Sequence, residues 1–159
     1  MNAYLSGGGT GTYNTDPELT GDIELQAGFY LFMDNGYGVI GSWTGDSDYD
    51  DFAPSLTVLP TVVSASTRGR VTVDAGIKAF ATDSGGEPRS KDREGLNDQF
   101  GGDEFGVITA QAGAALPELG DRLEFSVTHC DPTVNQYDRI HAVRADVVEA
   151  VWPIIARRG

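Results

Sequence analysis

Residues 55–75, with the sequence SLTVLPTVVSASTRGRVTVDA, carry the clearest secondary-structure signal of the chain. They are rich in β-branched residues, which favour extended structure. Pro60 marks an edge strand or a bulge, because proline lacks the N–H that a central strand needs. Arg68-Gly69-Arg70 predicts a turn, and the alternating residues 71–75 predict the next strand. This stretch therefore predicts β-structure.

Similar signals lie on both sides of it. Residues 25–33 (LQAGFYLFM) and 37–43 (YGVIGSW) flank Asn35-Gly36, a strong hairpin signal because both residues tolerate positive φ. Towards the C-terminus, the pattern predicts a long polar loop at 84–102, a strand at 105–111, a turn at 116–121 and a strand at 123–128 that leads into His129.

The C-terminal segment permits two interpretations. Apolar residues recur at helical spacing at Ile140, Val143, Val147, Val151 and Ile154. The same segment is crowded with β-branched residues and contains Pro153, which would break a helix. Residues 144–146 fit a turn between two strands, so a β-hairpin is favoured. No segment predicts a long helix, and the fold class is mainly β, with many short strands.

Composition excludes several classes of protein. The chain has 159 residues and a formal net charge of −13, from 24 acidic and 11 basic residues. Such a chain repels phosphate backbones and anionic lipids, so no nucleic acid and no membrane is expected as a partner. No apolar run reaches the roughly 18 residues of a transmembrane helix, and residues 1–11 do not resemble a secretory signal. The single Cys130 excludes an intrachain disulfide, and a cytoplasmic location is expected.

A glycine-rich segment, SGGGTGT at residues 6–12, differs from the rest of the chain. Such a loop lets backbone N–H groups and hydroxyls approach an anion such as phosphate. A flexible linker has the same composition. No Gly-Lys-Ser/Thr follows, so the segment is not a P-loop.

His129 and Asp131 are the candidate metal ligands. Residues two apart on a strand point to the same face, so both side chains could reach one ion, while Cys130 would face away. A histidine with a carboxylate suits Zn²⁺ or Mn²⁺, and two ligands leave positions open for substrate. The alternative is an ordinary strand-end histidine followed by a turn before Pro132. Lys78 shows no sign of a desolvated pocket and is expected to be exposed or ion-paired.

Four stretches resemble one known family in the same order along the chain. Residues 129–138 (HCDPTVNQYD) resemble the C-terminal metal motif of the D-threonine aldolase and D-serine dehydratase-like family. Residues 24–34 (ELQAGFYLFMD) are similar to its strand entering the C-terminal domain. Residues 6–13 (SGGGTGTY) are similar to its phosphate loop, and residues 74–79 (DAGIKA) also recur in these enzymes.

The resemblance implies an alanine racemase-like fold, with an N-terminal TIM-type barrel and a β-barrel-like C-terminal domain. Residues 1–20 would be a remnant of the barrel end with the phosphate loop, and residues 21–159 the β domain. The lysine that binds pyridoxal phosphate belongs to the barrel in this family, so no catalytic residue is predicted in this chain. We expect this chain to be the C-terminal part of the family's enzyme and to be inactive without the barrel.

The resemblance also implies the ligands. The cofactor-binding residues for pyridoxal phosphate would be Gly7, Gly8, Gly9 and Thr10. His129 and Asp131 would hold Mn²⁺ or Zn²⁺.

The position two after the metal histidine bears on the reaction. Aldolase-like members tend to have Asp there and dehydratase-like members Cys, so Asp131 favours cleavage of a D-3-hydroxy amino acid to glycine and an aldehyde. The resemblance further implies a homodimer. Phe105 stands where the family usually has a histidine. If that histidine serves the site, its loss would impair catalysis; if it only packs, Phe105 can replace it. The alternatives are a D-serine dehydratase-like lyase and a non-catalytic β assembly module.

Overall fold

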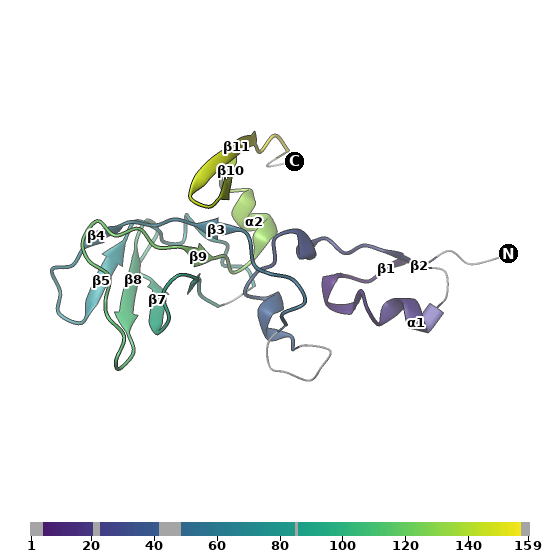
Figure 1. Cartoon of the computed structure of the whole chain (residues 1–159), viewed down its shortest axis with the longest axis horizontal. Coiled ribbons are helices and arrows are strands. Elements are labelled where there is room, and N and C mark those ends of the chain that lie inside the picture. Colours follow the sequence, from purple (N-terminus) through teal and green to yellow (C-terminus); the bar gives the residue numbers. More distant parts are fainter. Residues whose placement is uncertain (1–4, 21–22, 42–48, 85, 157–159) are drawn as a thin grey trace.

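The computed structural model describes residues 5–20, 23–41, 49–84 and 86–156. The predicted mainly β class is confirmed, and the strands that the structure describes form four small sheets that stay open rather than closing into a barrel. The molecule is elongated, with the first strands at one end, a four-stranded sheet at the other and short helical segments between them (Figure 1). In the described ranges we find no helix long and apolar enough to cross a membrane.

The largest sheet is antiparallel, in the order β4-β5-β8-β7. Its strands are β4 (Val62–Ser64), β5 (Arg70–Val73), β7 (Leu96–Phe100) and β8 (Gly106–Ala110). The predicted turn at Gly69 is confirmed, with a φ of 81°. Pro60 lies just before β4, whose register with β5 shifts at a bulge. The core of this sheet is aliphatic and is formed by Val62, Val71, Val73 and Ile108, all at most 3% exposed.

The predicted loop at residues 84–102 is partly wrong, because it contains β6 (Arg89–Ser90) and β7. The side chains of β7 are mostly polar, which hides the strand from an apolar pattern. It lies at the edge of the sheet, where one side faces solvent, and its backbone pairs with β8 over five residues, from Leu96 opposite Ala110 to Phe100 opposite Gly106. Backbone pairing, together with the packing of Leu96 and Phe100 on the core, therefore forms this strand.

The second sheet has the order β3-β9-β6, with β3 at Thr57–Val58 and β9 at Phe125–Ser126. The strand expected at 123–128 is thus confirmed, but it pairs over two residues only. Leu123, Phe125 and Val127 are at most 1% exposed. The chain then enters α2 (Cys130–Val134), so His129 caps a helix instead of ending a strand.

The hairpin expected around Asn35-Gly36 is wrong. The chain instead forms two 3₁₀ turns, η2 (Phe29–Leu31) and η3 (Tyr37–Val39), and residues 42–43 of the expected second strand lie outside the described residues. Gly36 has φ −65°, whereas the hairpin turn needs positive φ at both central residues. Asn35 is used in tertiary contacts instead: its N–H donates to the Val127 carbonyl, and its side-chain carbonyl accepts from the Ser126 hydroxyl at 2.7 Å.

The N-terminal part is a parallel strand pair, β1 (Leu5–Gly7) beside β2 (Ile23–Leu25). Between them lie η1 (Thr10–Thr12) and α1 (Asp16–Thr20). Parallel strands need such a crossover. The predicted domain boundary after residue 20 falls between the two strands, and the division into domains stays a prediction.

The C-terminal hairpin is confirmed as β10 (Arg139–Arg144) and β11 (Val147–Pro153). Ala145 and Asp146 have φ values of 48° and 63°, as a two-residue hairpin turn requires. The hairpin stands off from the rest of the molecule beyond α2 (Figure 1).

Candidate functional site

His129 occupies the junction between β9 and α2, with an extended backbone (φ −151°, ψ 125°). Its Nδ1 lies 2.7 Å from Oδ2 of Asp83, a residue 46 positions earlier in the chain. Hydrogen bonding to His129 holds the pKa of Asp83 below its usual value. The imidazole stacks on the ring of Phe29 at 5.5 Å between centroids, and Phe29 stacks on Tyr37 at 4.6 Å. The ring of His129 is thus held at one edge and on one face.

Asp34 connects the two helical segments next to this histidine. It is 2% exposed, and its two carboxylate oxygens accept separate backbone N–H groups: Oδ1 from Tyr37 at 2.9 Å and Oδ2 from Cys130 at 3.1 Å. The Cys130 thiol donates to the Met33 carbonyl. Burial, with the charges of Asp34 and Asp131, raises the pKa of this thiol to about 12, so it stays protonated and is a poor metal ligand.

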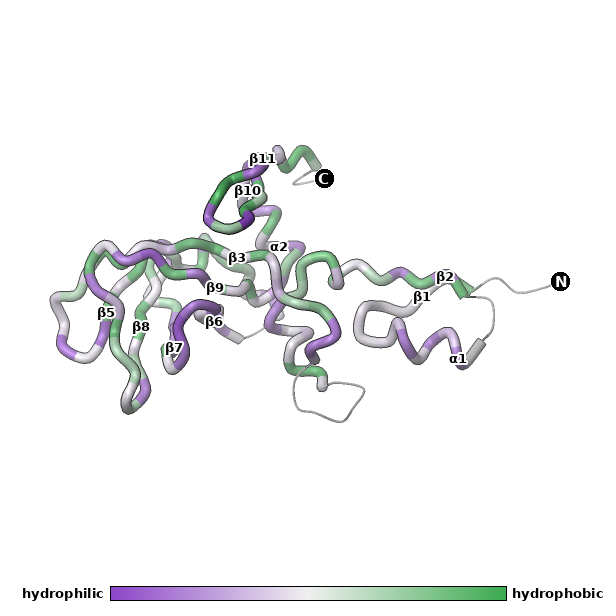
Figure 2. Tube along the Cα trace, in the orientation of Figure 1, coloured by the Kyte–Doolittle hydropathy of each residue, from purple (hydrophilic) through white to green (hydrophobic). Residues whose placement is uncertain are grey.

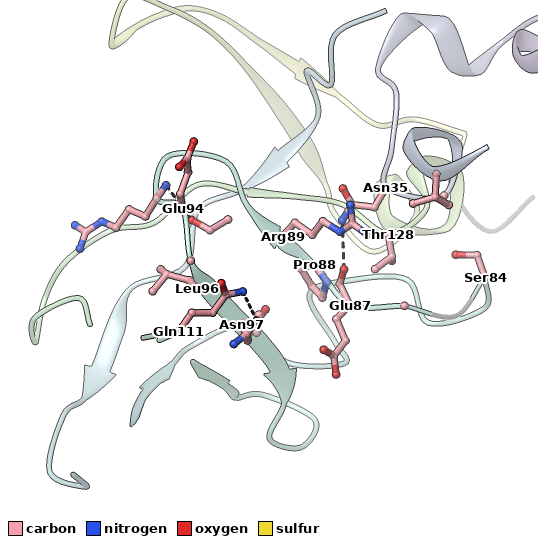
Figure 3. Close-up of a pocket in the computed structure, with 17 residues that line it drawn as sticks. Asn35, Ser84, Glu87, Pro88, Arg89, Glu94, Leu96, Asn97, Gln111 and Thr128 are labelled. Carbon is pink, nitrogen blue, oxygen red and sulfur yellow. Dashed lines mark hydrogen bonds between the residues drawn. The ribbon is translucent and has the colours of Figure 1, made fainter. Parts of the chain in front are cut away.

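Two adjoining cavities open at this site. The smaller, of about 160 Å³, is lined by His129, Phe29, Tyr37, Asp34, Ile40, Gly36, Ser84 and Thr128. The larger, of about 640 Å³, shares Gly36, Ser84 and Thr128 with it and extends towards Glu87, Leu96 and Gln111. Figure 3 shows Asn35 and Thr128 on one side of the larger cavity and Leu96, Asn97 and Gln111 on the other. A small, mostly apolar space therefore adjoins the histidine and leads to a larger one with mixed polar and apolar walls.

The predicted geometry of the metal pair is wrong, because the two residues do not share a strand. His129 is the N-cap of α2, and Asp131 lies in its first turn, exposed to solvent. Within the described ranges no group of three or more His, Cys, Asp and Glu side chains forms a ready metal centre. The donor set still suits a divalent ion, since Asp83 engages Nδ1 of His129 and leaves Nε2 for coordination. The metal assignment stays a prediction.

The glycine-rich loop lies on the far side of the same aromatic stack. A Cβ at Gly9 would lie 3.8 Å from the Tyr37 hydroxyl, and one at Gly11 would lie 3.5 Å from the Tyr37 ring. The structure therefore brings the loop and His129 to opposite sides of the Phe29–Tyr37 pair.

Within the loop, two of the four predicted cofactor residues already have internal partners. Thr10 is 1% exposed, and its hydroxyl accepts the Tyr30 N–H at 3.0 Å. The Gly9 N–H donates to the Thr12 hydroxyl. A Cβ at Gly7 would meet nothing within 4 Å, whereas one at Gly8, where φ is 76°, would meet the Asp16 carboxylate. Gly8 is exposed and Gly7 half-buried, so their backbone is the accessible part of the loop, with the Asp16 carboxylate beside it.

The remaining candidates lie apart from this arrangement. Lys78 is exposed and pairs with Glu104 at 3.1 Å, which confirms the expectation of an ion-paired lysine. Phe105 is 47% exposed. Sequence reasoning missed Asp83 and the double role of Asp34, because nothing in their local sequence indicates partners 46 and 96 positions away.

Comparison with solved structures defines the class of fold. The chain superposes on a D-threonine aldolase from Filomicrobium marinum with a TM-score of 0.86 and 36% identity, covering 97% of this chain and 41% of that one. It also superposes on an alanine racemase-like protein from Idiomarina loihiensis, with a TM-score of 0.73 and 20% identity over 96% of this chain and 44% of that one. The fold is therefore that of a C-terminal portion of alanine racemase-like proteins.

A family model described as "Putative serine dehydratase domain" matches residues 55–143, more than half of the chain. The chain belongs to this serine dehydratase domain family. It is 40% identical over 153 residues to a D-threonine aldolase of Arthrobacter sp. and 37% identical over 155 residues to a 3-hydroxy-D-aspartate aldolase of Paracoccus denitrificans. These alignments cover 96% and 97% of this chain but only 39% of each relative.

Proposed function

We propose that this chain is the metal-binding portion of a pyridoxal phosphate-dependent lyase that cleaves D-3-hydroxy amino acids to glycine and an aldehyde. The observation that carries the proposal is the held imidazole of His129, which lines a small, mostly apolar cavity that adjoins a larger cavity of mixed polarity, with the glycine-rich loop next to the Phe29–Tyr37 stack. The names of the relatives from Arthrobacter and Paracoccus support the aldolase reaction. A cytoplasmic homodimer is part of the same proposal.

His129 Nε2 and the Asp131 carboxylate would hold Mn²⁺ or Zn²⁺. Such an ion lowers the pKa of a bound hydroxyl group, which is the group that loses its proton when a 3-hydroxy amino acid is cleaved. The chain's own residues would orient the metal-binding histidine and shield it from water, since Phe29 covers one face of its ring and Tyr37 stacks in turn on Phe29. Ser84 and Thr128 would line the space open to the substrate.

The backbone of Gly7 and Gly8 would meet the phosphate of pyridoxal phosphate, which supplies the electron sink for the carbanion when it is bound. Thr10 would support that loop from inside, since its hydroxyl accepts the Tyr30 N–H and its carbonyl accepts the Tyr49 hydroxyl. The chain spans 39% of its curated relatives. We propose that the rest of an enzyme of their length provides the lysine and that this chain alone is inactive.

A D-serine dehydratase-like reaction is the second candidate, favoured by the description of the family model. The two reactions differ in their products: a dehydratase yields pyruvate or 2-oxobutanoate, and an aldolase yields glycine and an aldehyde. Product analysis of an enzyme that contains this chain distinguishes them.

The metal site is tested by metal content. The purified chain is loaded with Mn²⁺ or Zn²⁺, desalted and analysed, in parallel with His129→Ala, Asp131→Ala and the control His141→Ala, which changes the other of the two histidines. We expect metal in the parent and in His141→Ala, and loss in the other two variants. Equal metal in all four proteins would contradict the site and favour a non-catalytic assembly module.

A further inference from the structure

Asp83 follows a loop segment that is hydrogen-bonded to the residues around His129. The preceding Ala81 is 3% exposed, and both of its backbone groups are hydrogen-bonded to the segment that carries the histidine. Its N–H donates to the Thr133 hydroxyl at 2.9 Å, and its carbonyl accepts from the Thr128 hydroxyl. Thr128 and Thr133 are each 2% exposed. Residues on either side of His129 are thus hydrogen-bonded to the loop two positions before Asp83.

The carboxylate of Asp83 is also held locally. The backbone N–H groups of Asp83 and Ser84 lower its pKa in addition to the contact with His129. The side chain of Asp83 is 53% exposed. The side chain of His129 is 27% exposed.

The two ring nitrogens of His129, Nδ1 and Nε2, therefore differ in protonation. A carboxylate can only accept, so Nδ1 must carry the proton when it lies 2.7 Å from Asp83 Oδ2. In the neutral ring Nε2 is then an unprotonated donor of an electron pair. The imidazole also stacks on Phe29, with the two ring planes 19° apart, and this contact limits tilting of the imidazole out of its plane.

We propose that Asp83 is a positioning residue that fixes His129 in the Nδ1–H tautomer and aims its Nε2 at the divalent ion. This inference rests on the proposed metal site. Carboxylates in this position typically change metal affinity by about 10- to 100-fold. Asp83 acts through His129 and does not touch the ion or the substrate.

The first test needs no variant. The chain has only two histidines, so ¹⁵N-edited NMR at a pH where both imidazoles are neutral resolves both rings. The exposed His141 serves as the reference. We expect His129 to carry its proton on Nδ1. A proton on Nε2 of His129 would overturn the inference, whatever happens to metal binding.

The second test measures Mn²⁺ affinity of the chain from paramagnetic broadening of the two histidine rings. We expect Asp83→Asn to weaken binding at His129 by about 10- to 100-fold, Asp83→Glu to restore part of it, and the charge control Asp146→Asn to leave it unchanged. Asp146 lies in the turn of the C-terminal hairpin, at a positive φ that asparagine tolerates.

The outcomes separate the two proposals. If His129→Ala retains no metal on analysis of its metal content but Asp83→Asn binds Mn²⁺ like the parent, the metal site stands and the role of Asp83 is refuted. If His129→Ala binds as the parent does, the metal site itself is refuted, and the positioning role with it. If Asp83→Asn fails to fold, the role of Asp83 is judged from two other measurements. These are the tautomer of His129 in the parent and the Mn²⁺ affinity of Asp83→Glu.

Discussion

Asp98 is a buried carboxyl group in β7. It is 6% exposed, and among the residues that the structure describes its Oδ1 is the one buried side-chain oxygen or nitrogen without a hydrogen-bond partner. It lies in β7 facing Gly106, where a Cβ would come within 3.2 Å of that oxygen. Burial is the main cause that raises its pKa to about 7, and the charge of Glu87 adds to it. The folded chain therefore holds a proton here that the unfolded chain releases.

The sign of the resulting pH dependence follows from linkage. The stabilisation is fully present below the ordinary pKa of 3.8 and is lost as the pH rises through about 7. In that window this one group lowers the free energy of unfolding by about 1.4 kcal/mol per pH unit. We predict that Asp98→Asn stabilises the chain relative to the parent more at about pH 8 than at about pH 5, as measured by urea unfolding. Asp146→Asn should show no such change. An equal difference at both pH values would refute a protonated Asp98.

Short helical elements replace the expected hairpin around Asn35, and a tertiary contact decides this. The Asn-Gly pair has the right residues for a two-residue turn, but Asp34 binds the N–H groups of Tyr37 and Cys130 at once. That pair of bonds favours helical geometry after Asp34 and joins η3 to α2. Local propensity is the weaker influence here, because the competing interaction comes from a residue 96 positions away.

Asp34→Ala should therefore affect two elements together. It leaves the buried N–H of Cys130 and the partly buried N–H of Tyr37 without an acceptor, and a fully buried group of this kind costs about 1–3 kcal/mol. We predict a loss of roughly 2–4 kcal/mol in the free energy of unfolding, and hydrogen exchange at Tyr37 and Cys130 should accelerate in parallel. Asp50→Ala, a change at an exposed aspartate, is the control. Faster exchange at only one of the two amides would show that the carboxylate does not link the elements.

Several large apolar side chains of the molecule are exposed, and the C-terminal hairpin carries many of them. In the C-terminal hairpin Val147 is 62% exposed, Trp152 54% and Val151 46%. Figure 2 shows hydrophobic and hydrophilic residues side by side along this hairpin. The parallel pair β1–β2 has no further strand beside it in the part of the chain that is described. Surfaces of this kind are usually covered by another part of the protein or by a partner.

We predict that the chain associates as its concentration rises and that Val147→Thr with Val151→Thr weakens this association at least several-fold, since threonine keeps the β-branched shape but adds a hydroxyl. Sedimentation velocity measures the effect. Val63→Thr, on the exposed side of β4, is the matched control. Association that the double variant leaves unchanged would exclude the hairpin as the contact.

The sequence by itself determined the β class, the strands β4, β5 and β8 of the four-stranded sheet and the C-terminal hairpin, because β-branched runs, glycine turns and Pro153 act over a few residues. It also carried the motifs by which the chain resembles its family. Only the tertiary structure decided that polar β7 pairs with β8, that residues 29–39 are helical, and that His129 caps α2 against Asp83. These features depend on hydrogen bonds between residues distant in the chain, which no local pattern records.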